Sequence, residues 1–390
     1  MKECFRVVMV AACPYPTTQG TQVYIRGLSR ALVEAGHEVH IVTYHFGEDL
    51  PPCGAVVHRI SGPASYSKLR AGPAWGKPLL DFLLLVELLR VVREVRPDLV
   101  HVHNYEAPVA GYIARRLTGI PVLYNSHNFM VDELHTYFEG RVARGLARRL
   151  ARFLDEQVPR RADSCIAISP EALPLLERLG VPPERLHYIP PGLHADEFPR
   201  SLSSEATECT APRIVYAGNP DRYQDLDLLL RAMLPVREQL PEARLRIVSG
   251  ADLSEVVTLA REIGVPMEAL ELVTTSDWPS VCRAIVEARV AALPRVLCRG
   301  FPIKLLNYMA LGMPVVACAG SAKFLRNGTE GRVVAPEEGA FADALVDLLE
   351  NPKAASRMGR AARTSVLNEH LWSRRVPAIE RAYASMLASP

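Results

Sequence analysis

The sequence lacks any apolar run long enough to cross a membrane. Its most apolar stretch, residues 79–92, is interrupted by Asp81, Glu87 and Arg90, whereas a transmembrane helix needs about 20 mostly apolar residues. Near the N-terminus only six apolar residues follow one another, from Val7 to Ala12, which is too short for the core of a signal peptide. We therefore expect a cytoplasmic protein whose first apolar run is a buried strand.

Net charge and cysteine pairs are also scarce. The 45 Lys and Arg residues nearly balance the 43 Asp and Glu residues, so the composition does not indicate a dedicated nucleic-acid-binding protein. None of the eight cysteines forms a Cys-x-x-Cys pair, and no histidines stand at zinc-ligand spacing. Several cysteines, such as Cys165 and Cys318, lie inside apolar runs. These features favour buried, reduced thiols over disulfides or a metal site.

What is present is an alternation of short β-branched runs with longer helical patterns over 390 residues. Expected strands are 5–12, 39–44, 99–103, 121–126, 165–169, 186–190, 213–217, 244–249, 271–274, 289–294 and 314–318. Expected helices are 23–36, 78–97, 106–119, 139–161, 225–239, 253–263, 279–288 and 302–311. The alternation breaks in a Pro- and Ser-rich linker near 192–212. This predicts two tandem doubly wound, Rossmann-like α/β domains that face a cleft, with ligands outside the carboxyl ends of the strands.

Cations gather where one expected strand of the second half meets its helix. Arg295 and Arg299 lie in the loop, and Lys304 lies in the first turn of helix 302–311. A cation in a first turn is unfavourable against the helix dipole unless an anion is bound. The segment therefore indicates an anion site, with ordinary surface cations as the alternative. Asp225 and Asp227 open another helix, and helix capping is favoured for them over metal binding.

Several motifs carry a resemblance to a known family. They are FRVVMVAACPYPTTQGTQVYIRGL, DLVHVHN, YNSHN, IAISPEAL, YIPPGLHADEF, IVYAGNPDRYQDLDLLLRAM and GFPIKLLNYMALGMPVVA. In this order they resemble the retaining family-4 glycosyltransferases of the GT-B fold, over nearly the whole chain. The resemblance implies an N-terminal acceptor-binding domain, 1–195, and a C-terminal donor-binding domain, 196–372. A last helix, 373–390, is expected to pack back on the first domain.

The same resemblance implies a function. It is retaining, metal-independent transfer of a hexosyl or N-acetylhexosaminyl group from a nucleotide sugar to a hydroxyl of a glycan, glycolipid or small-molecule acceptor. A UDP-sugar is preferred as donor and GDP-mannose comes second; the donor is a co-substrate, and no cofactor is expected. Two alternatives stay open: a catalytically inactive homologue that binds a partner, and a nucleotide-sugar 2-epimerase.

The chain departs from the family pattern at the donor site. The usual pair of glutamates falls on Arg299 and Asn307, and the usual diphosphate-binding Arg and Lys fall on Asn219 and Gln224. Some branches of the family carry a Pro-Arg pair and a Lys instead, and this chain resembles them, with Arg295 after Pro294 and with Lys304.

Site residues carried over from the family fall into three groups. The catalytic group, with His127 at the donor sugar and two cations at the diphosphate, is His127, Lys304 and Arg295. The donor-binding group is Gly20, Gly218, Asn219, Gln224, Thr274, Arg299, Gly300, Phe301, Pro302, Ile303 and Asn307. The acceptor-binding group is Asn104 and Asn128. No metal ligand and no nucleic-acid contact is expected.

Two basic segments could also bring the protein to the inner face of a membrane. The loop 61–77 combines aromatic and basic residues, and helix 139–161 carries seven arginines beside an apolar face. Such a combination can anchor a protein to anionic lipid. A core-packed helix with a solvated face is the alternative.

Overall fold

The computed structural model describes residues 4–50, 53–62, 76–198 and 212–388. The chain divides into two compact units. Unit 1 comprises Met1–Gly192, Arg299–Phe301 and Trp372–Pro390, and unit 2 comprises Leu193–Cys298 and Pro302–Leu371. The expected division placed 299–301 in the second domain, whereas these three residues cluster with unit 1. Most of the expected loop 61–77 and of the expected linker 192–212 lies outside the described residues.

Unit 1 is built on a parallel sheet of seven strands in the order β3-β2-β1-β4-β5-β6-β7. The strands are β1 (Arg6–Ala11), β2 (Glu38–Thr43), β3 (Val56–Arg59), β4 (Leu99–His103), β5 (Val122–Ser126), β6 (Ser164–Ala167) and β7 (Leu186–Tyr188). Every residue of β4 and β5 is buried, as expected for central strands that are covered on both faces. The order reverses between β1 and β4, which is the doubly wound arrangement.

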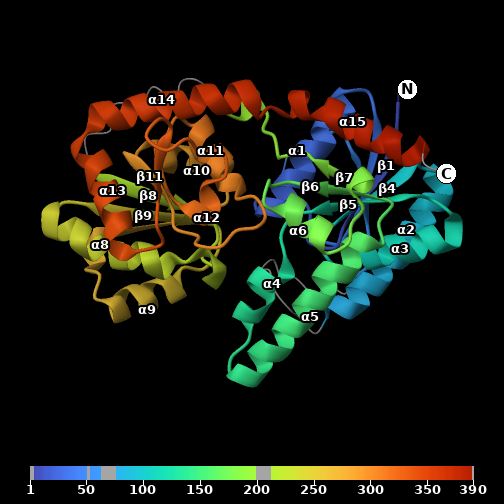
Figure 1. Ribbon diagram of the computed structural model, residues 1–390, viewed down its shortest axis with the longest axis horizontal. Coiled ribbons are helices and arrows are strands. Elements are labelled where there is room, and N and C mark those ends of the chain that lie inside the picture. Colours follow the sequence, from blue (N-terminus) through green and yellow to red (C-terminus); the bar gives the residue numbers. More distant parts are fainter. Residues whose placement is uncertain (1–3, 51–52, 63–75, 199–211, 389–390) are drawn as a thin grey trace. The chain divides into compact units, whose positions relative to one another are not determined.

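Helices cover both faces of this sheet (Figure 1). The layer of α2 (Lys77–Val95), α3 (Ala107–Thr118) and α5 (Arg141–Arg160) shares one apolar core with the sheet. On the other face, α1 (Gly20–Glu34) packs against α15 (Trp372–Ala388). Gly20 was expected just before the first helix, but it is the first helical residue. Shorter elements are α4 (Met130–Glu133), α6 (Ala172–Arg178), η1 (Leu134–Tyr137) and η2 (Pro183–Arg185).

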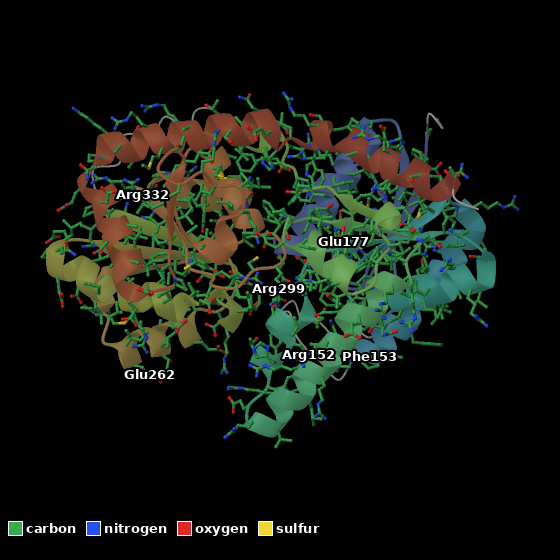
Figure 2. The ribbon with its side chains drawn as sticks, viewed as in Figure 1. Arg152, Phe153, Glu177, Glu262, Arg299 and Arg332 are labelled. Atoms are coloured by element: carbon green, nitrogen blue, oxygen red, sulfur yellow. The ribbon has the colours of Figure 1, made fainter. Side chains whose placement is uncertain are left out.

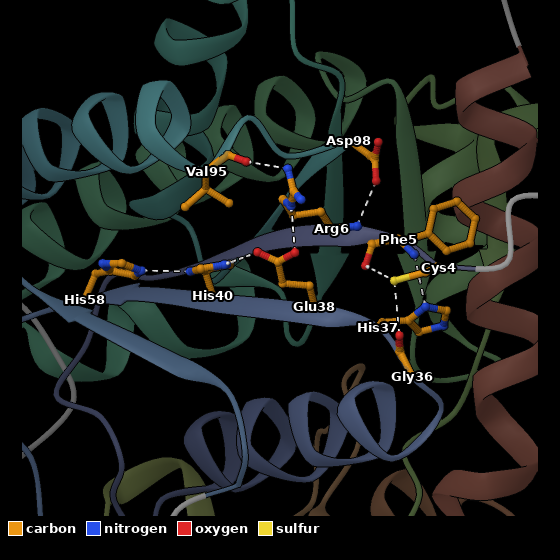
Figure 3. Close-up of polar contacts among 10 residues, drawn as sticks. All are labelled: Cys4, Phe5, Arg6, Gly36, His37, Glu38, His40, His58, Val95 and Asp98. Carbon is orange, nitrogen blue, oxygen red and sulfur yellow. Dashed lines mark hydrogen bonds and ion pairs between the residues drawn. The ribbon is translucent and has the colours of Figure 1, made fainter.

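Polar contacts tie the amino-terminal ends of the central strands together (Figure 3). The backbone N–H of Arg6 donates to Asp98, and the Arg6 guanidinium donates to Glu38 at 2.7 Å. Glu38 also lies 2.9 Å from His40, whose other ring nitrogen lies 2.9 Å from His58. This network is at the edge opposite to the strand carboxyl ends, so it supports the register of β1 and β2 and does not belong to the site.

Unit 2 is built on a parallel sheet of six strands in the order β10-β9-β8-β11-β12-β13. The strands are β8 (Arg213–Ala217), β9 (Arg244–Ser249), β10 (Leu270–Thr274), β11 (Val290–Leu293), β12 (Val315–Cys318) and β13 (Gly331–Val334). Two tandem doubly wound α/β units were predicted, and this prediction is confirmed. The edge strands β3 and β13 were not predicted.

The helices of unit 2 also lie on both faces of its sheet (Figure 1). One layer contains α8 (Leu226–Gln239), α9 (Ser254–Ile263) and α13 (Glu338–Glu350), and α8 and α13 pack closely together. The other layer contains α10 (Trp278–Val286), α11 (Ile303–Ala310) and α14 (Pro352–Glu369). Short elements are α12 (Ala319–Ala322), η3 (Ala195–Glu197), η4 (Arg222–Gln224) and η5 (Met267–Ala269).

Two further expectations concern the whole chain. Within the described ranges, no helix is both long and apolar enough to span a bilayer. The seven described cysteines are free, and all but Cys4 are buried; Cys209 lies outside the described residues.

Candidate functional site

Lys304 lies at the carboxyl edge of the unit 2 sheet, in the first turn of α11. Pro302 stands just before that helix, which begins at Ile303. The Lys304 ammonium donates to the Tyr216 hydroxyl at 2.6 Å and to Gln224 Oε1 at 2.9 Å, and it lies 4.2 Å from the centre of the Tyr216 ring. Both hydrogen-bonding partners are neutral groups, a hydroxyl and an amide oxygen.

The surroundings of Lys304 make its charge unfavourable. Burial, and to a lesser extent the positive charge of Arg295, lower the pKa of Lys304 to about 7, while Asp221 acts in the opposite direction. Desolvation and a like charge are two of the ordinary causes of such a shift. The charged form of the ammonium is therefore unfavourable near neutral pH.

Arg295 brings a second cation to the same end of unit 2. Its side chain is only 8% exposed, its Nε donates to the carbonyl of Leu297 at 3.0 Å, and its guanidinium lies 4.8 Å from the centre of the Tyr223 ring. Tyr223 in turn accepts a hydrogen bond from Asn219 Nδ2 at 3.1 Å. Arg295 in the loop after β11 and Lys304 in the first turn of α11 thus each lie against a tyrosine ring.

Gly218 makes room for the ammonium. Its φ is +147°, and a Cβ at this position would lie 2.7 Å from Lys304 Nζ. Its N–H donates to the carbonyl of Val248 at 2.9 Å, which fixes the chain there. The backbone conformation therefore favours glycine, and a Cβ here would displace the ammonium of Lys304.

Asp225 does not cap α8 as expected. It occupies the position before that helix in a left-handed conformation, with φ +53°, and makes no side-chain capping bond. Its carboxylate instead accepts a hydrogen bond from the backbone N–H of Val296 at 2.7 Å. Because Val296 follows Arg295, the carboxylate fixes the loop that carries the second cation.

The other expected donor residues of unit 2 occupy the same strand ends. Asn307 lies one turn after Lys304 on α11 and is half-buried, Gln224 is buried, and Thr274 is exposed at the end of β10. An open cavity of about 460 Å³ is lined by Asp225, Asp227, Leu228, Arg231, Val296, Pro336, Glu337 and Glu338. Its acidic lining does not suit a diphosphate, so we place the candidate anion site at the two cations instead. Within the described part of the chain, no cluster of three or more His, Cys, Asp or Glu side chains could hold a metal ion.

In unit 1, His127 follows β5 and is buried in a group of polar rings. Its Nε2 lies 2.9 Å from His103 Nδ1 and 3.4 Å from Asn125 Nδ2, and its ring meets Tyr24 edge-on at 4.8 Å. Burial, and to a lesser extent the neighbouring His101, lower the pKa of His127 to about 3. His127 is therefore neutral at physiological pH, so it can exchange a hydrogen bond with a ligand but carries no charge.

The two expected acceptor residues follow the ends of the neighbouring strands β4 and β5. Asn104 follows β4 with a φ of +65°. Asn128 donates to Glu133 Oε2 at 2.7 Å, and its carbonyl accepts from the Tyr105 hydroxyl at 2.9 Å. At Gly20 a Cβ would meet no protein atom within 4 Å, so packing does not explain the glycine.

Arg299, Gly300 and Phe301 belong to unit 1, and the structure gives two of them clear partners there. Arg299 pairs with the buried carboxylate of Asp132, and its carbonyl accepts from the Ser169 hydroxyl. A Cβ on Gly300 would collide with the backbone carbonyl of His127. Arg299 and Gly300 thus make contacts within unit 1, and the expected binding of the donor by these three residues stays a prediction.

Sequence reasoning missed four residues that shape the two sites: Tyr216 and Tyr223 in unit 2, and His101 and His103 in unit 1. A signal existed for the histidines. The strand LVHVH places both on one face at i and i+2, and two polar residues on one face of a central strand are unusual. The tyrosines carry no local signal, because Tyr216 is one of several bulky residues in a buried strand.

Comparison with known proteins supports this organisation. Residues 19–192 match the family model of a glycosyl transferase 4-like domain, and residues 211–351 match the family model of glycosyl transferases group 1. The D-inositol 3-phosphate glycosyltransferase of Xylanimonas cellulosilytica is 28% identical, and the alignment covers 92% of each chain. The protein of the same name from Pseudarthrobacter chlorophenolicus is 27% identical over 91% of this chain and 87% of its own.

Solved structures share the fold over the whole length. Sucrose-phosphate synthase from Thermosynechococcus elongatus has a TM-score of 0.82 with 19% identity and full coverage of both chains. HepE of Anabaena in complex with UDP and glucose has a TM-score of 0.76 with 15% identity, over 98% of this chain and 100% of its own. With both units matched in order by family models, the chain belongs to the family-4 glycosyltransferases of the GT-B fold.

Proposed function

We propose that this glycosyltransferase transfers a hexosyl or N-acetylhexosaminyl group from a nucleotide sugar, with retention and without a metal ion. The observation that carries the proposal is the pair of cations in unit 2. Lys304 lies in the first turn of α11 with neutral partners, and Arg295 is buried above a tyrosine ring. A bound diphosphate would be stabilised by these two cations and by the amino-terminal dipole of α11.

The chemistry follows from where charge develops. As the bond between sugar and diphosphate breaks, negative charge grows on the leaving diphosphate, and preorganised cations stabilise such charge without a metal. Lys304 and Arg295 would neutralise it, together with the amino-terminal dipole of α11. Gly218 would leave the space that a close approach to the ammonium needs. Asn219, Gln224, Thr274 and Asn307 would contact the remainder of the nucleotide.

Unit 1 would contribute contacts to the sugar and the acceptor. His127 is neutral because burial holds its pKa at about 3, so it suits a hydrogen bond with a sugar hydroxyl better than proton transfer at neutral pH. Asn104 and Asn128 follow neighbouring strands and would hold the acceptor hydroxyl. The acceptor class that we propose is a glycan, a glycolipid or a small molecule.

A UDP-sugar is our first choice of donor, and GDP-mannose is the second. The structurally similar HepE of Anabaena has been crystallised with UDP, with UDP-glucose, and with UDP and glucose. The loop after β10, where Thr274 is exposed, would hold the base.

The decisive experiment is a panel of nucleotide sugars with and without EDTA. Release of nucleoside diphosphate is followed for UDP-glucose, UDP-N-acetylglucosamine and GDP-mannose, and the anomeric configuration of the product is read by NMR. We expect one UDP-sugar to be consumed with retention, at a rate unaffected by EDTA. Loss of turnover with EDTA and its recovery with Mn²⁺ would contradict the metal-independent mechanism. Epimerised donor without transfer would favour the epimerase, and binding without turnover the inactive homologue.

We further propose that unit 1 contacts anionic lipid through the layer of α2, α3 and α5. Ten large apolar side chains are exposed on these helices: Leu79, Phe82, Val86, Val109, Ile113, Leu117, Val142, Leu146, Leu150 and Phe153. On α5 the exposed apolar residues alternate with exposed arginines, and Arg152 and Phe153 are labelled in Figure 2. A lipid surface provides both an apolar phase and negative charge. The loop residues 63–75 lie outside the described residues and carry no part of this argument.

Sedimentation with vesicles tests the lipid contact. We expect binding to vesicles that contain phosphatidylglycerol and weaker binding to neutral phosphatidylcholine, with each arginine near the surface contributing about 1 kcal/mol. Arg148→Glu with Arg152→Glu should abolish binding, whereas Arg357→Glu, an exposed position of unit 2, should not. Equal binding of all variants would show that α5 does not contact the lipid.

A further inference from the structure

A continuous set of polar side chains lies behind His127 in unit 1. All of its members are buried, and they come from β4, β5, α1 and α15: His101, His103, Asn125, Tyr24 and Tyr383. Burial lowers the pKa of His101 to about 3 and that of His103 well below its usual value. Each imidazole therefore carries a single ring proton at neutral pH, and the neighbours decide which nitrogen holds it.

The two ends of the Asn125 amide determine which neighbouring atoms donate and which accept hydrogen bonds. Its Oδ1 accepts from the Tyr24 hydroxyl at 3.0 Å and lies 3.4 Å from His101 Nε2. A carbonyl oxygen can only accept, so His101 must hold its proton on Nε2. His101 Nδ1 is then bare, and it accepts from the Tyr383 hydroxyl at 2.9 Å.

The other end of the same amide determines the state of His127. Asn125 Nδ2 can only donate, and it lies 3.4 Å from His127 Nε2. His127 Nε2 must therefore be bare. His103 Nδ1 lies 2.9 Å from the same nitrogen, so it is the donor in that contact, and the one proton of His127 is on Nδ1.

The reversed amide would be less favourable. With Asn125 turned over, His127 would donate from Nε2 to His103 Nδ1, and the proton of His103 would move to its own Nε2. That atom is fully buried and has no hydrogen-bond partner in the described structure. An N–H group left there would be an unpaired buried donor, which is rarer and more costly than an unused lone pair.

We infer that Asn125 and His103 act as positioning residues that fix His127 with its proton on Nδ1, so that it meets a ligand as a hydrogen-bond donor. No partner of His127 Nδ1 occurs among the described residues, and the atom is not one of the buried unpartnered ones. The ligand atom it selects is then an acceptor, such as a sugar hydroxyl oxygen. The identity of that ligand rests on the proposed function, whereas the position of the proton does not.

The position of the proton can be measured directly. The full-length protein is labelled with ¹⁵N-histidine, and two-bond ¹H–¹⁵N spectra at pH 7 distinguish protonated from bare ring nitrogens. The signals of His127 are identified by their absence in His127→Gln. We expect a protonated Nδ1 and a bare Nε2 on His127. The opposite assignment would overturn the inference without any further variant.

Two variants test which neighbour sets the tautomer. Asn125→Asp preserves the shape but presents only acceptors, so the proton of His127 should appear on Nε2. His101→Phe removes a buried histidine on the other side of Asn125 and should leave the His127 tautomer unchanged. An unaltered His127 spectrum in Asn125→Asp would refute the role of the amide. If that variant does not fold, His103→Phe replaces it, and we expect mixed tautomers because one of the two donors to Nε2 is lost.

Kinetics with the donor sugar separate this inference from the proposed function. In Asn125→Asp we expect kcat to fall roughly tenfold or more, since one hydrogen bond to the ligand is lost, while UDP affinity stays the same. In the same variant, adding His127→Ala should cause little further loss. A switched tautomer with unchanged kcat would confirm the positioning by Asn125 and would instead contradict the contact between His127 and the sugar.

Discussion

Replacing Lys304 by methionine should stabilise the protein and weaken nucleotide binding at the same time. The side chain keeps most of its length, and the charge is removed. Lowering the pKa of a lysine from 10.5 to about 7 corresponds to an unfavourable free energy on the order of 5 kcal/mol for the folded charged form. The two hydrogen bonds that are lost, to Tyr216 and Gln224, contribute about 1 kcal/mol each.

The balance favours the variant by about 2–3 kcal/mol at pH 7 or below, after these two bonds are subtracted. The sign follows from linkage. The folded pKa lies below the unfolded one, so the cost is complete below about pH 7 and disappears as pH rises toward 10.5. Thermal unfolding should therefore show a higher Tm for Lys304→Met at pH 6.5, with the difference from wild type shrinking at pH 9.

UDP affinity should fall in Lys304→Met, although the stability of the protein rises. A bound diphosphate favours the charged lysine, so wild-type UDP affinity should fall by up to tenfold per pH unit above about 7. Lys304→Met should bind UDP about ten- to hundredfold more weakly at pH 7, because a charge-assisted contact of about 1.5–3 kcal/mol is lost. Titration calorimetry between pH 7 and 8.5 measures the UDP affinity of both proteins, and the ionisation of UDP itself is common to both.

Calorimetry in two buffers of different ionisation enthalpy then counts protons. Wild type should take up a fraction of a proton on binding UDP at pH 7.5, and Lys304→Met should take up less. A lower Tm together with unchanged UDP affinity would refute the reasoning, since it would make Lys304 a structural residue. A lower Tm together with weaker UDP binding would indicate that Lys304→Met is misfolded.

Three further substitutions have distinct expected results. His127→Ala should raise the activation free energy of transfer by about 2–4 kcal/mol and should change UDP affinity little. Equal losses of transfer rate and of UDP affinity would mean that His127 is a structural residue. Gly218→Ala should weaken UDP binding, because its Cβ displaces the ammonium of Lys304; calorimetry at pH 7 would show an unchanged Kd if the diphosphate lies elsewhere. Arg299→Ala should lower stability by about 1–3 kcal/mol, because it removes the arginine from the buried carboxylate of Asp132, and leave UDP affinity intact. Tenfold weaker binding of UDP by Arg299→Ala would show that Arg299 contacts the donor.

The sequence predicted the central strands well and the edge strands poorly, for a physical reason. Every residue of β4 and β5 is buried, so these strands are continuous apolar runs. β3 pairs on one side only, and three of its four residues are exposed, so burial imposes no pattern on it. β13 is only four residues long and begins with Gly331, and a short run of this kind does not differ from a loop.

The candidate site was only partly accessible from sequence. Lys304 was found because a cation in the first turn of a helix conflicts with the helix dipole, which is a local property. Its partner Tyr216 lies 88 residues away in the chain, and no spacing rule connects the two. Arg299 has a partner that its sequence spacing did not indicate. Its position beside Arg295 in sequence suggested one anion site, yet its side chain pairs with Asp132 in unit 1.

Asp225 shows how a local rule can fail for a reason that lies at the site. An aspartate before a helix normally bonds to the first free N–H groups of that helix, but the left-handed backbone of Asp225 directs its carboxylate to Val296 instead. Burial raises the pKa of this carboxyl group, while the N–H of Val296 lowers it. The hydrogen bond from Val296 to Asp225 fixes the loop that carries Arg295. It also places a negative charge near the proposed anion site. Lys304 and His127 share one cause with Asp225: burial disfavours the charged form of each side chain.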